Sequence, residues 1–214
     1  MKLTVHTFAS LDGVMQGPGS PEEDPSGGFD RGGWVVPFME EDFGRVVDSW
    51  FARTTELLFG RTTYDLMAGY WPQVTDPDDA VAAVLNGSPK HLVSTTVTAP
   101  SWANTVSVIA DDVAGRVREL TNRPGGELQV HGSWRLVQAL HEAGLVDVYR
   151  IIEFPVVVGE GKRLFRDGAT ASSFDVVETQ VLGSGAVYRV LRPTPFTRGA
   201  FSVEDGRETV ALDV

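Results

Sequence analysis

Strand-like and helix-like hydrophobic patterns take turns along this chain. Apolar and polar side chains alternate over residues 3–8, and short apolar runs follow at 57–59, 91–94, 106–109 and 128–131, which predicts five strands. Residues 40–54 instead place Phe43, Val46, Val47, Trp50 and Phe51 at helical spacing, as one broad apolar stripe. Such alternation is typical of an α/β sheet with crossover helices.

Capping signals predict two more helices. Asp111 or Asp112 can cap a helix that carries Val113, Val117 and Leu120 on its apolar side. The next helix follows the strand at 128–131 and ends at Gly144, and its inward positions are Leu136, Val137, Leu140 and Ala143.

The last third of the chain has a different character. Strand patterns at 148–154, 174–181 and 186–191 follow one another with no long helix between them, which predicts a mostly parallel sheet that finishes with antiparallel strands. After a Pro-x-Pro break, residues 193–214 carry a pair of short strand patterns around Phe201 and Val210. We therefore expect one domain over 1–192 and a C-terminal extension over 193–214. The extension could dock on the domain or on a partner chain, or stay mobile, which is the default for a terminus.

Composition narrows the class of protein. The chain has 214 residues, 42% of them hydrophobic, and this is enough for one well-buried core. It contains no cysteine, no apolar run near the roughly 20 residues of a membrane span, and a strand-like start that does not resemble a signal peptide, so we expect a cytoplasmic protein. The net charge of −11 argues against nucleic-acid binding. An anionic ligand would need local donors, such as arginine side chains or helix N-terminal amides.

The segment 57–64 carries the clearest candidate site. A buried strand ends at Gly60, and Arg61, Thr62 and Thr63 then open a helix. Unpaired amides of the first helical turn, a guanidinium and two hydroxyls together suit a phosphate group. On spacing alone the alternative is favoured, in which Thr62 or Thr63 only caps the helix and Arg61 pairs with a surface carboxylate.

Two further strand ends share this character. The segment 128–137 passes from a strand through Gly132 and Ser133 into a helix, and the strand over 91–94 leads into three hydroxyl residues, Ser94, Thr95 and Thr96. Ligands in open α/β sheets lie beyond the carboxyl ends of the strands. Three such ends therefore predict one shared crevice.

Other residues have both a functional and a structural interpretation. Asp12 could donate a proton near the crevice, although on the sequence alone an Asp-Gly turn without a function is the favoured interpretation. Trp34, Trp71 and Trp102 lie in predicted loops, where they could stack on a flat ligand or pack against the domain. The loop over 13–33 is long enough to act as a lid. The four histidines, His6, His91, His131 and His141, have no metal-ligand spacing, so we interpret them as structural and expect no metal.

Five spaced motifs carry a family resemblance. They are SLDGVM (10–15), FGRTTYDLM (59–67), LVSTT (92–96), LQVHGSWRLVQALHEAGLVD (128–147) and FPVVVGEGKRLF (154–165). In this order they resemble the dihydrofolate-reductase-like family that shares its domain with the C-terminal half of the bifunctional riboflavin-biosynthesis deaminase/reductase. The resemblance covers about residues 1–192. It implies a mixed, mostly parallel eight-stranded sheet flanked by helices, NADP(H) as cofactor and frequent homodimers.

The resemblance also implies roles for individual residues. Gly60, Arg61, Thr62 and Thr63 would hold the 2′-phosphate and diphosphate region of the cofactor, and Ser94 and Thr95 would flank the adenine ribose. Gly132, Ser133 and Trp134 would lie under the diphosphate, and Asp12, Gly13 and Val14 would line the nicotinamide side. True dihydrofolate reductases have a glycine pair where this chain has Gly132 and Ser133. Asp42 and Asp48 lie on the helix that carries the pterin-binding acid in those enzymes, but neither matches a motif, which argues against folate reduction.

The leading hypothesis is an NADPH-dependent reductase that transfers a hydride to a small pterin-like or riboflavin-precursor-like heterocycle. Its reaction would resemble that of 5-amino-6-(5-phosphoribosylamino)uracil reductase or dihydrofolate reductase. Asp12 or an ordered water would supply the proton, and Trp34, Trp71 and the loop over 13–33 would cover the substrate. One alternative is a non-catalytic, dimeric nucleotide- or pterin-binding module, because fold does not guarantee chemistry. Another is a structural partner whose C-terminal extension drives assembly.

Overall fold

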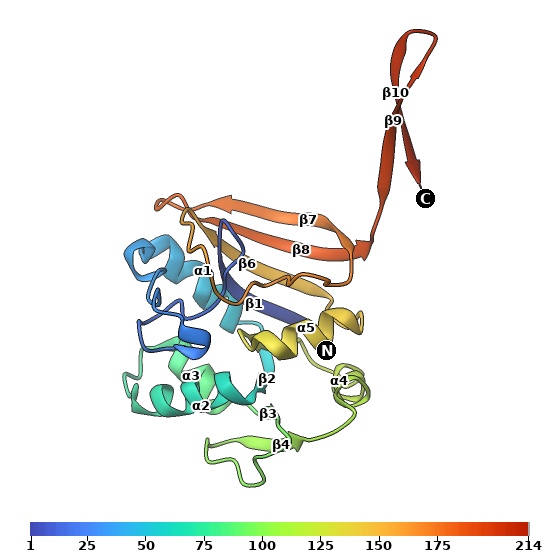
Figure 1. Cartoon of the computed structure of the whole chain (residues 1–214). Helices are drawn as coiled ribbons and strands as arrows, with labels where there is room; N and C mark the ends of the chain where they lie inside the picture. The colour runs from blue at the N-terminus through green and yellow to red at the C-terminus, as the bar shows by residue number, and fades with distance from the viewer. Residues whose placement is uncertain (214) are drawn as a thin grey trace.

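Eight strands form one central sheet in the computed structural model, which describes residues 1–213. The strands of this sheet are β1 (Lys2–Ser10), β2 (Thr54–Gly60), β3 (Lys90–Val93), β4 (Thr105–Ile109), β5 (Glu127–His131), β6 (Val148–Phe154), β7 (Ser172–Val181) and β8 (Val187–Pro195). Their order is β4-β3-β2-β5-β1-β6-β8-β7, with β1 near the middle (Figure 1). Strands β1 to β6 pair in parallel, whereas β8 runs antiparallel to both β6 and β7. The predicted mixed, mostly parallel sheet with an antiparallel finish is confirmed.

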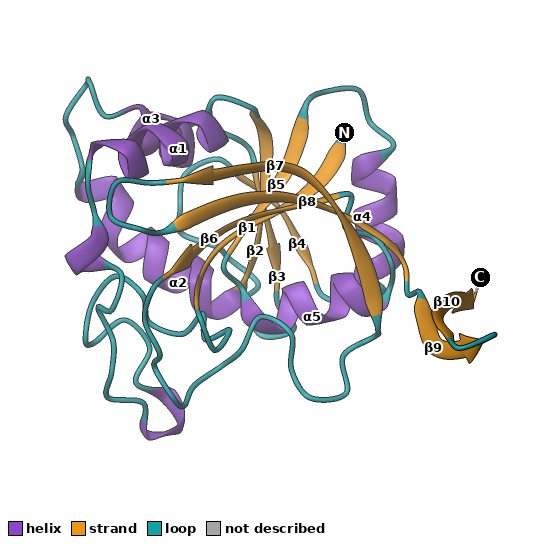
Figure 2. Ribbon diagram, turned by 90° about the horizontal axis from the view of Figure 1, so that it is seen from above, coloured by secondary structure: helices purple, strands orange, loops and turns teal. Residues whose placement is uncertain are grey.

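Helices cover both faces of the sheet (Figure 2). The helices are α1 (Glu41–Phe51), α2 (Arg61–Tyr70), α3 (Ala80–Gly87), α4 (Val113–Thr121) and α5 (Trp134–Glu142). Side chains of α4 and α5 pack with β1, β5 and β6 in one core cluster, and α1 packs with β6 and β8 in a second. A third cluster joins α2 and α3 to β2 and β3. The described helices include none that is long and apolar enough to cross a membrane.

The capping chemistry follows the sequence closely. The Asp112 carboxylate accepts a hydrogen bond from the Gly115 amide at the start of α4, and Gly144 adopts a left-handed φ of 61° just after α5. Helix α3 was not expected. It begins at Ala80 and is capped by Asp79, whose carboxylate accepts a hydrogen bond from the Ala82 amide. Three short 3₁₀ turns, Ser26–Gly28, Val36–Phe38 and Trp71–Gln73, lie in the long connections.

The C-terminal extension forms a separate hairpin. Strands β9 (Arg198–Glu204) and β10 (Arg207–Asp213) pair antiparallel, and Phe201 lies directly opposite Val210. The pair of strands around these two residues is therefore confirmed. Figure 1 shows the hairpin projecting away from the sheet beyond the end of β8, which itself continues to Pro195, past the expected boundary at residue 192.

Candidate active site

A cavity of about 860 Å³ opens beside the central strands, within the size range of small-molecule sites. Its walls come from β1, from the loop that follows β1, from helices α1, α2 and α3, and from the junction between β5 and α5. The walls thus combine segments far apart in the sequence, as expected for a ligand site at the ends of parallel strands.

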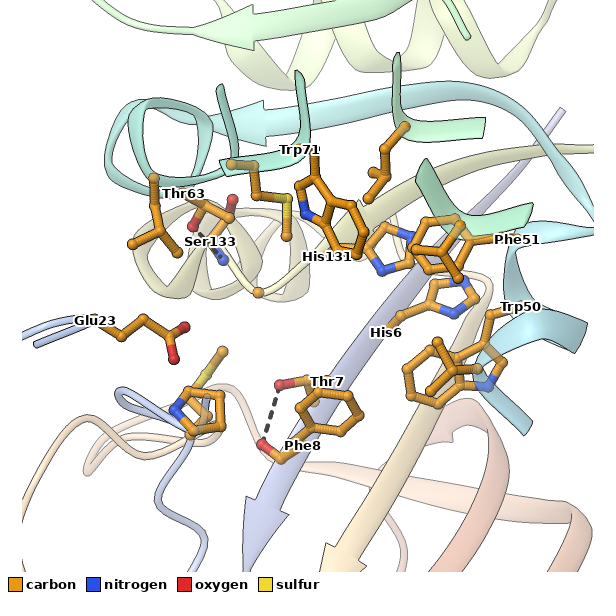
Figure 3. A pocket seen from close by; sticks show the side chains of 18 of the residues that line it. His6, Thr7, Phe8, Glu23, Trp50, Phe51, Thr63, Trp71, His131 and Ser133 are labelled. Atoms are coloured by element: carbon orange, nitrogen blue, oxygen red, sulfur yellow. Dashed lines mark hydrogen bonds between the residues drawn. The ribbon is translucent and has the colours of Figure 1, made fainter. Parts of the chain in front are cut away.

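Two strand-to-helix junctions meet at one wall of this cavity. The amide of Gly60, at the end of β2, donates to the hydroxyl of Ser133 over 3.0 Å. The Ser133 amide, before α5, donates in turn to the hydroxyl of Thr63 in the first turn of α2, also over 3.0 Å (Figure 3). The expected convergence of the segments 57–64 and 128–137 is therefore present. We call this wall, formed by Thr62, Thr63, Gly132, Ser133 and Trp134, the helix-terminus wall.

Neither helix at this wall has a side-chain cap. Gly60 precedes α2 and Ser133 precedes α5, and no side chain within residues 1–213 accepts a hydrogen bond from the first-turn amides at either end. Thr63 accepts from Ser133 instead of capping its own helix, so the alternative in which a threonine is only a cap does not hold. Two uncapped N-termini concentrate partial positive charge and N–H donors at one place, which suits an anion.

Gly132 and Ser133 both adopt left-handed backbone conformations, with φ of 59° at each. Glycine adopts this conformation freely, whereas a serine there is strained. The Ser133 side chain is held by the Gly60 amide, which contributes to fixing the turn. Ser133 stands where true dihydrofolate reductases have the second glycine of a pair, and it keeps the left-handed backbone conformation that favours glycine.

Arg61 lies just outside the cavity lining. Its guanidinium donates to the Thr96 hydroxyl over 2.8 Å and lies 3.3 Å from the Asp65 carboxylate, so the expected pairing with a surface carboxylate occurs. Ser94 is buried, and its hydroxyl accepts from the amides of Thr96 and Val97 in a local turn. Thr95 is exposed, and like Gly60, Arg61 and Ser94 it does not line the cavity. The Arg61–Thr96 hydrogen bond connects the segment 94–96 to the start of α2, so both lie on the outer side of the helix-terminus wall.

The position of Asp12 does not support proton donation. Its carboxylate accepts hydrogen bonds from the Ser10 hydroxyl and from the amides of Val158 and Gly159, over 2.6, 3.0 and 2.8 Å. Burial raises the pKa of this carboxyl, but the three hydrogen bonds outweigh it and hold the pKa at about 2. Asp12 is therefore ionised at neutral pH. Its carboxylate links the loop after β1 to the loop after β6, and Asp12 does not line the cavity.

In the loop after β1, the residues that line the cavity come slightly later in the sequence than the resemblance implied. Gly13 and Val14 lie outside the lining, and Val14 is fully buried, whereas Met15, Gln16 and Gly17 line it. Trp34 also lies outside. Its indole donates to the Gln16 carbonyl over 2.8 Å and packs edge-on against Phe154, so it anchors this loop and cannot stack on a ligand in the cavity.

Three tryptophans do reach the cavity, namely Trp50 on helix α1, Trp71 and Trp134. Trp71 lines it from the end of α2 (Figure 3), and Trp134 lines it from the start of α5, with its indole bonded to the Arg163 carbonyl. Trp102, in contrast, is buried against Phe59 and Tyr64. Of the three loop tryptophans, only Trp71 can contact a ligand in this cavity.

A second wall of the cavity was missed by the sequence analysis. His6 from β1 and His131 from β5 stack with ring centroids 4.7 Å apart, and Phe51 stacks on His131 at 4.5 Å (Figure 3). Trp50 and Phe8 complete this surface, which we call the aromatic floor. The signal in the sequence was a histidine inside each of two buried strands, but only the register that pairs His6 with His131 brings them together.

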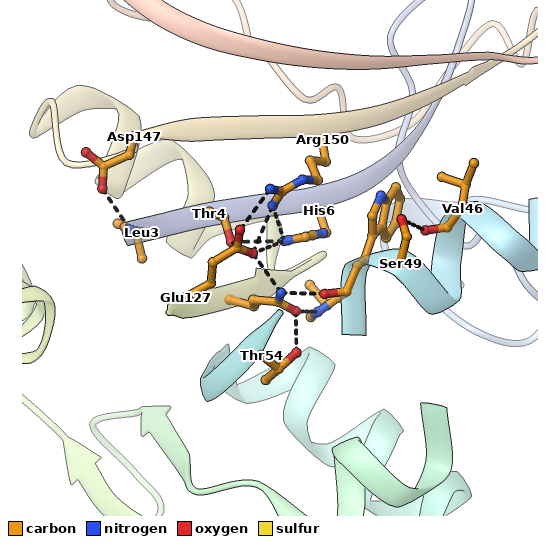
Figure 4. Close-up of polar contacts among 12 residues, drawn as sticks. Leu3, Thr4, His6, Val46, Ser49, Thr54, Glu127, Asp147 and Arg150 are labelled. Atoms are coloured by element: carbon orange, nitrogen blue, oxygen red, sulfur yellow. Dashed lines mark hydrogen bonds and ion pairs between the residues drawn. The ribbon is translucent and has the colours of Figure 1, made fainter. Parts of the chain in front are cut away.

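A buried polar network holds the floor in place (Figure 4). Glu127 and Arg150 form a two-pronged ion pair with N–O distances of 2.8 and 2.9 Å. The Thr4 hydroxyl bridges the Glu127 carboxylate and the Nε2 atom of His6. The Gln129 amide nitrogen donates to Glu127 and to the Trp50 carbonyl, which leaves its oxygen to accept from His131 Nε2 over 3.0 Å. His131 is therefore protonated on Nε2.

Burial keeps both imidazoles of the floor neutral. It lowers the pKa of His131 to about 3, and for His6 burial together with the neighbouring His131 and Arg150 lowers the pKa well below its ordinary value. The floor thus presents flat, uncharged rings. The Nδ1 atom of His6 is buried and has no hydrogen-bond partner within residues 1–213.

The fold and the sequence place the chain in a known family. The model of the RibD C-terminal domain matches residues 1–188, so the chain belongs to this family. It is 29% identical over 188 residues to the uncharacterized protein YyaP of Bacillus subtilis (strain 168), covering 87% of this chain and 92% of YyaP.

Solved structures agree on the dihydrofolate-reductase-like fold. A pyrimidine reductase-like protein from Corynebacterium diphtheriae superposes with a TM-score of 0.61 at 11% identity, over 90% of this chain and 92% of that one. The dihydrofolate reductase of Enterococcus faecalis, complexed with NADP(H), superposes with a TM-score of 0.56 at 10% identity, over 90% and 96%. At these identities the likeness shows the fold alone.

Proposed function

We propose that this protein is an NADP(H)-dependent reductase of a small pterin-like or riboflavin-precursor-like heterocycle. The observation that carries the proposal is the helix-terminus wall, where two uncapped helices are joined by the hydrogen bonds of Thr63 and Ser133 inside the cavity. The membership of the RibD C-terminal domain family and the reductase names of the structural neighbours add support.

The residues present fit an anionic dinucleotide. The first-turn amides of α2 and α5 and the hydroxyls of Thr62 and Thr63 would hold the diphosphate. Arg61, on the outer side of this wall, would pair with the 2′-phosphate by exchanging its Asp65 and Thr96 contacts for the stronger anion. Without these donors the net charge of −11 would repel such a ligand.

When bound, NADPH supplies a hydride to a C=N or C=O bond. The aromatic floor would orient the flat ring of the substrate and exclude water from one of its faces. Asp12 would not supply the proton, because it lies outside the cavity with a pKa of about 2, and the neutral imidazoles of the floor would not supply it either. The donor would be water or Glu23, which lines the cavity and whose pKa is raised by burial. The protein itself contributes binding, orientation and a dry surface.

The test is consumption of NADPH, followed by absorbance, with a panel of pterins, flavin precursors and quinone-like acceptors. We expect oxidation with at least one flat heterocycle and loss of this activity in a His131→Ala variant that still binds NADPH. Binding of NADPH without oxidation across the whole panel would instead favour the non-catalytic nucleotide-binding module.

We further propose that the protein forms a homodimer through the β9–β10 hairpin. Phe201, Val203, Val210 and Leu212 share one face of this hairpin and are 64–77% exposed, while Ser202 and Thr209 lie on the other face. A two-stranded hairpin alone is marginally stable in water, and a self-complementary apolar face favours a second copy. Light scattering should report a dimer for the intact chain and a monomer for Phe201→Ser, and a monomer for both would refute this proposal.

A further inference from the structure

The cavity that would hold the substrate is strongly acidic. Six of its lining residues are carboxylates without an ion pair to any residue within 1–213: Glu23, Glu40, Asp48, Asp76, Asp78 and Asp79. They come from three separate segments, namely the loop after β1, helix α1 with the residue before it, and the loop before α3. Asp48, Asp76 and Asp78 are exposed, so they lie at the opening of the cavity.

Positive charge inside the cavity is already neutralised. Lys162 is the one lysine or arginine among the described lining residues, and its ammonium lies 2.5 Å from the seventh carboxylate, Asp24. The same ammonium donates to the Ser26 hydroxyl. Among residues 1–213, therefore, the lining holds no lysine or arginine without an ion pair that could bind a phosphate or carboxylate group of a substrate.

The aromatic floor adds a second, independent observation. Its two imidazoles are neutral, so they offer ring faces but no charge to an anionic group. The buried Nδ1 atom of His6 has no hydrogen-bond partner in the part of the chain that is described. Buried polar atoms in native proteins are nearly always satisfied, so an unsatisfied one in a cavity wall points to a polar ligand or water at that wall.

We propose that the substrate is a flat heterocycle that is uncharged or cationic and carries neither a phosphate nor a carboxylate group. This inference rests on the proposed reductase function and narrows its substrate class. Charges of like sign within a partly desolvated cavity repel one another, and a polyanionic cofactor at the helix-terminus wall would add to this repulsion. A phosphorylated pyrimidine or a glutamylated pterin would therefore be excluded, whereas an amine-bearing ring would be attracted.

A neighbouring cavity of about 510 Å³ provides the strongest counter-argument. It contains Lys162, Arg163 and Arg166, which could receive an anionic tail. However, Arg163 already donates to the carbonyls of Asp12 and Gly159, and Arg166 lies 2.5 Å from the Glu142 carboxylate. We therefore expect the basic residues of this cavity to stabilise the fold and not to bind a ligand, and variants of Arg163 and Arg166 test this expectation.

The experiment compares three probes built on one ring: 6-(aminomethyl)pterin, 6-(hydroxymethyl)pterin and pterin-6-carboxylate. Their dissociation constants are measured by pterin fluorescence at low salt, with and without saturating NADPH. We expect the cationic probe to bind at least about tenfold more tightly than the anionic one, and the ratio to fall as ionic strength rises. Equal affinities, or tighter binding of the carboxylate, would overturn the proposal.

Variants then locate the effect. The triple variant Asp48→Asn, Asp76→Asn, Asp78→Asn should reduce the preference for the cationic probe by about three- to tenfold. The matched control, Asp111→Asn, Glu178→Gln, Glu204→Gln, removes the same charge from exposed positions outside the cavity and should leave the preference unchanged. If both triple variants act equally, the net charge of the protein and not the cavity sets the preference, and the proposal fails.

A last variant tests the basic cavity. Arg163→Gln with Arg166→Gln should leave the binding of pterin-6-carboxylate unchanged, and a large loss would show that this cavity holds anions. NADPH binding in the same titrations distinguishes a failure of the proposed reductase function from a failure of the proposed substrate class. Absence of NADPH binding contradicts the proposed reductase, whereas NADPH binding with no charge preference among the probes contradicts only the substrate class.

Discussion

The helix-terminus wall and the aromatic floor line the same cavity but offer opposite chemistry. The first presents hydroxyls and uncapped backbone amides at the starts of α2 and α5, which attract an anion. The second presents stacked neutral rings, and acidic side chains lie at the opening of the cavity. The cavity is therefore divided into a wall suited to a dinucleotide and a floor suited to a flat ring without negative charge.

The two walls also differ in what supports them. Two hydrogen bonds of 3.0 Å between the two junctions hold the helix-terminus wall, through Gly60, Thr63 and Ser133. The floor depends on a buried charged pair, Glu127 and Arg150, which reaches His6 through Thr4. Damage to the first should therefore affect ligand binding, and damage to the second should affect the stability of the whole sheet.

The largest expected effect is on folding. Glu127→Ala leaves the Arg150 guanidinium buried without its partner, so we expect the free energy of unfolding to fall by about 3–5 kcal/mol. Denaturant unfolding measures this loss. The matched control is Glu142→Ala, which breaks the exposed pair with Arg166 and should cost under about 1 kcal/mol. Similar losses in the two variants would mean that the network does not support the floor.

The next effect is a loss of stability in mild acid. Burial lowers the pKa of His131 to about 3 and that of His6 well below its ordinary value, so the unfolded chain binds protons that the folded chain refuses. Stability is therefore complete above the unfolded pKa of about 6.5 and is lost as the pH falls below it, by about 1.4 kcal/mol per pH unit for each histidine. Denaturant unfolding between pH 6.5 and 4.5 measures this slope.

His131→Phe is the control for that slope. Phenylalanine keeps a ring on Phe51 but cannot take up a proton, so the variant should lose roughly half of the pH dependence whatever its absolute stability. An unchanged slope would show that His131 is protonated in the folded protein.

A smaller effect is expected at the helix-terminus wall. Thr63→Val removes the hydroxyl that accepts from the Ser133 amide and lines the cavity, which should weaken binding of both NADPH and NADH by about fivefold. Binding of 6-(hydroxymethyl)pterin should stay unchanged, because the floor is untouched. Thr98→Val, at an exposed position outside the cavity, is the control. Loss of pterin binding in Thr63→Val would contradict the division of the cavity.

The smallest effect on the cavity is expected from the C-terminal hairpin. A chain that ends at residue 196 lacks β9 and β10, neither of which contributes to the core clusters or to the cavity lining. We expect its NADPH affinity to remain within about twofold of the intact chain. A larger change would show that the hairpin acts on the site.

Local features of this fold could be predicted from the sequence, and non-local ones could not. The junction after Gly60 and the junction at Ser133 were predicted because strand, turn and helix follow one another within about ten residues. His6 and His131 were assigned to structure because nothing in either strand specifies which strand will lie beside it. Their pairing is a property of the sheet register.

The direction in which a side chain points was the second feature that could not be predicted from the sequence. Asp12 and Trp34 are in the loop regions where function was expected, but the Asp12 carboxylate binds the amides of Val158 and Gly159, and the Trp34 ring packs on Phe154. These partners are more than a hundred residues away in sequence. The residue type alone could not distinguish a ligand contact from a loop anchor.

The central claim is that the helix-terminus wall binds NADP(H), and a fluorescence titration of the purified protein with NADPH and with NADH tests it most directly. We expect tight binding of NADPH and weak binding of NADH. Arg61→Ala should weaken binding of NADPH by about tenfold or more and that of NADH hardly at all, because this change removes the partner of the 2′-phosphate. No binding of either nucleotide, or an equal loss of both in Arg61→Ala, would contradict it.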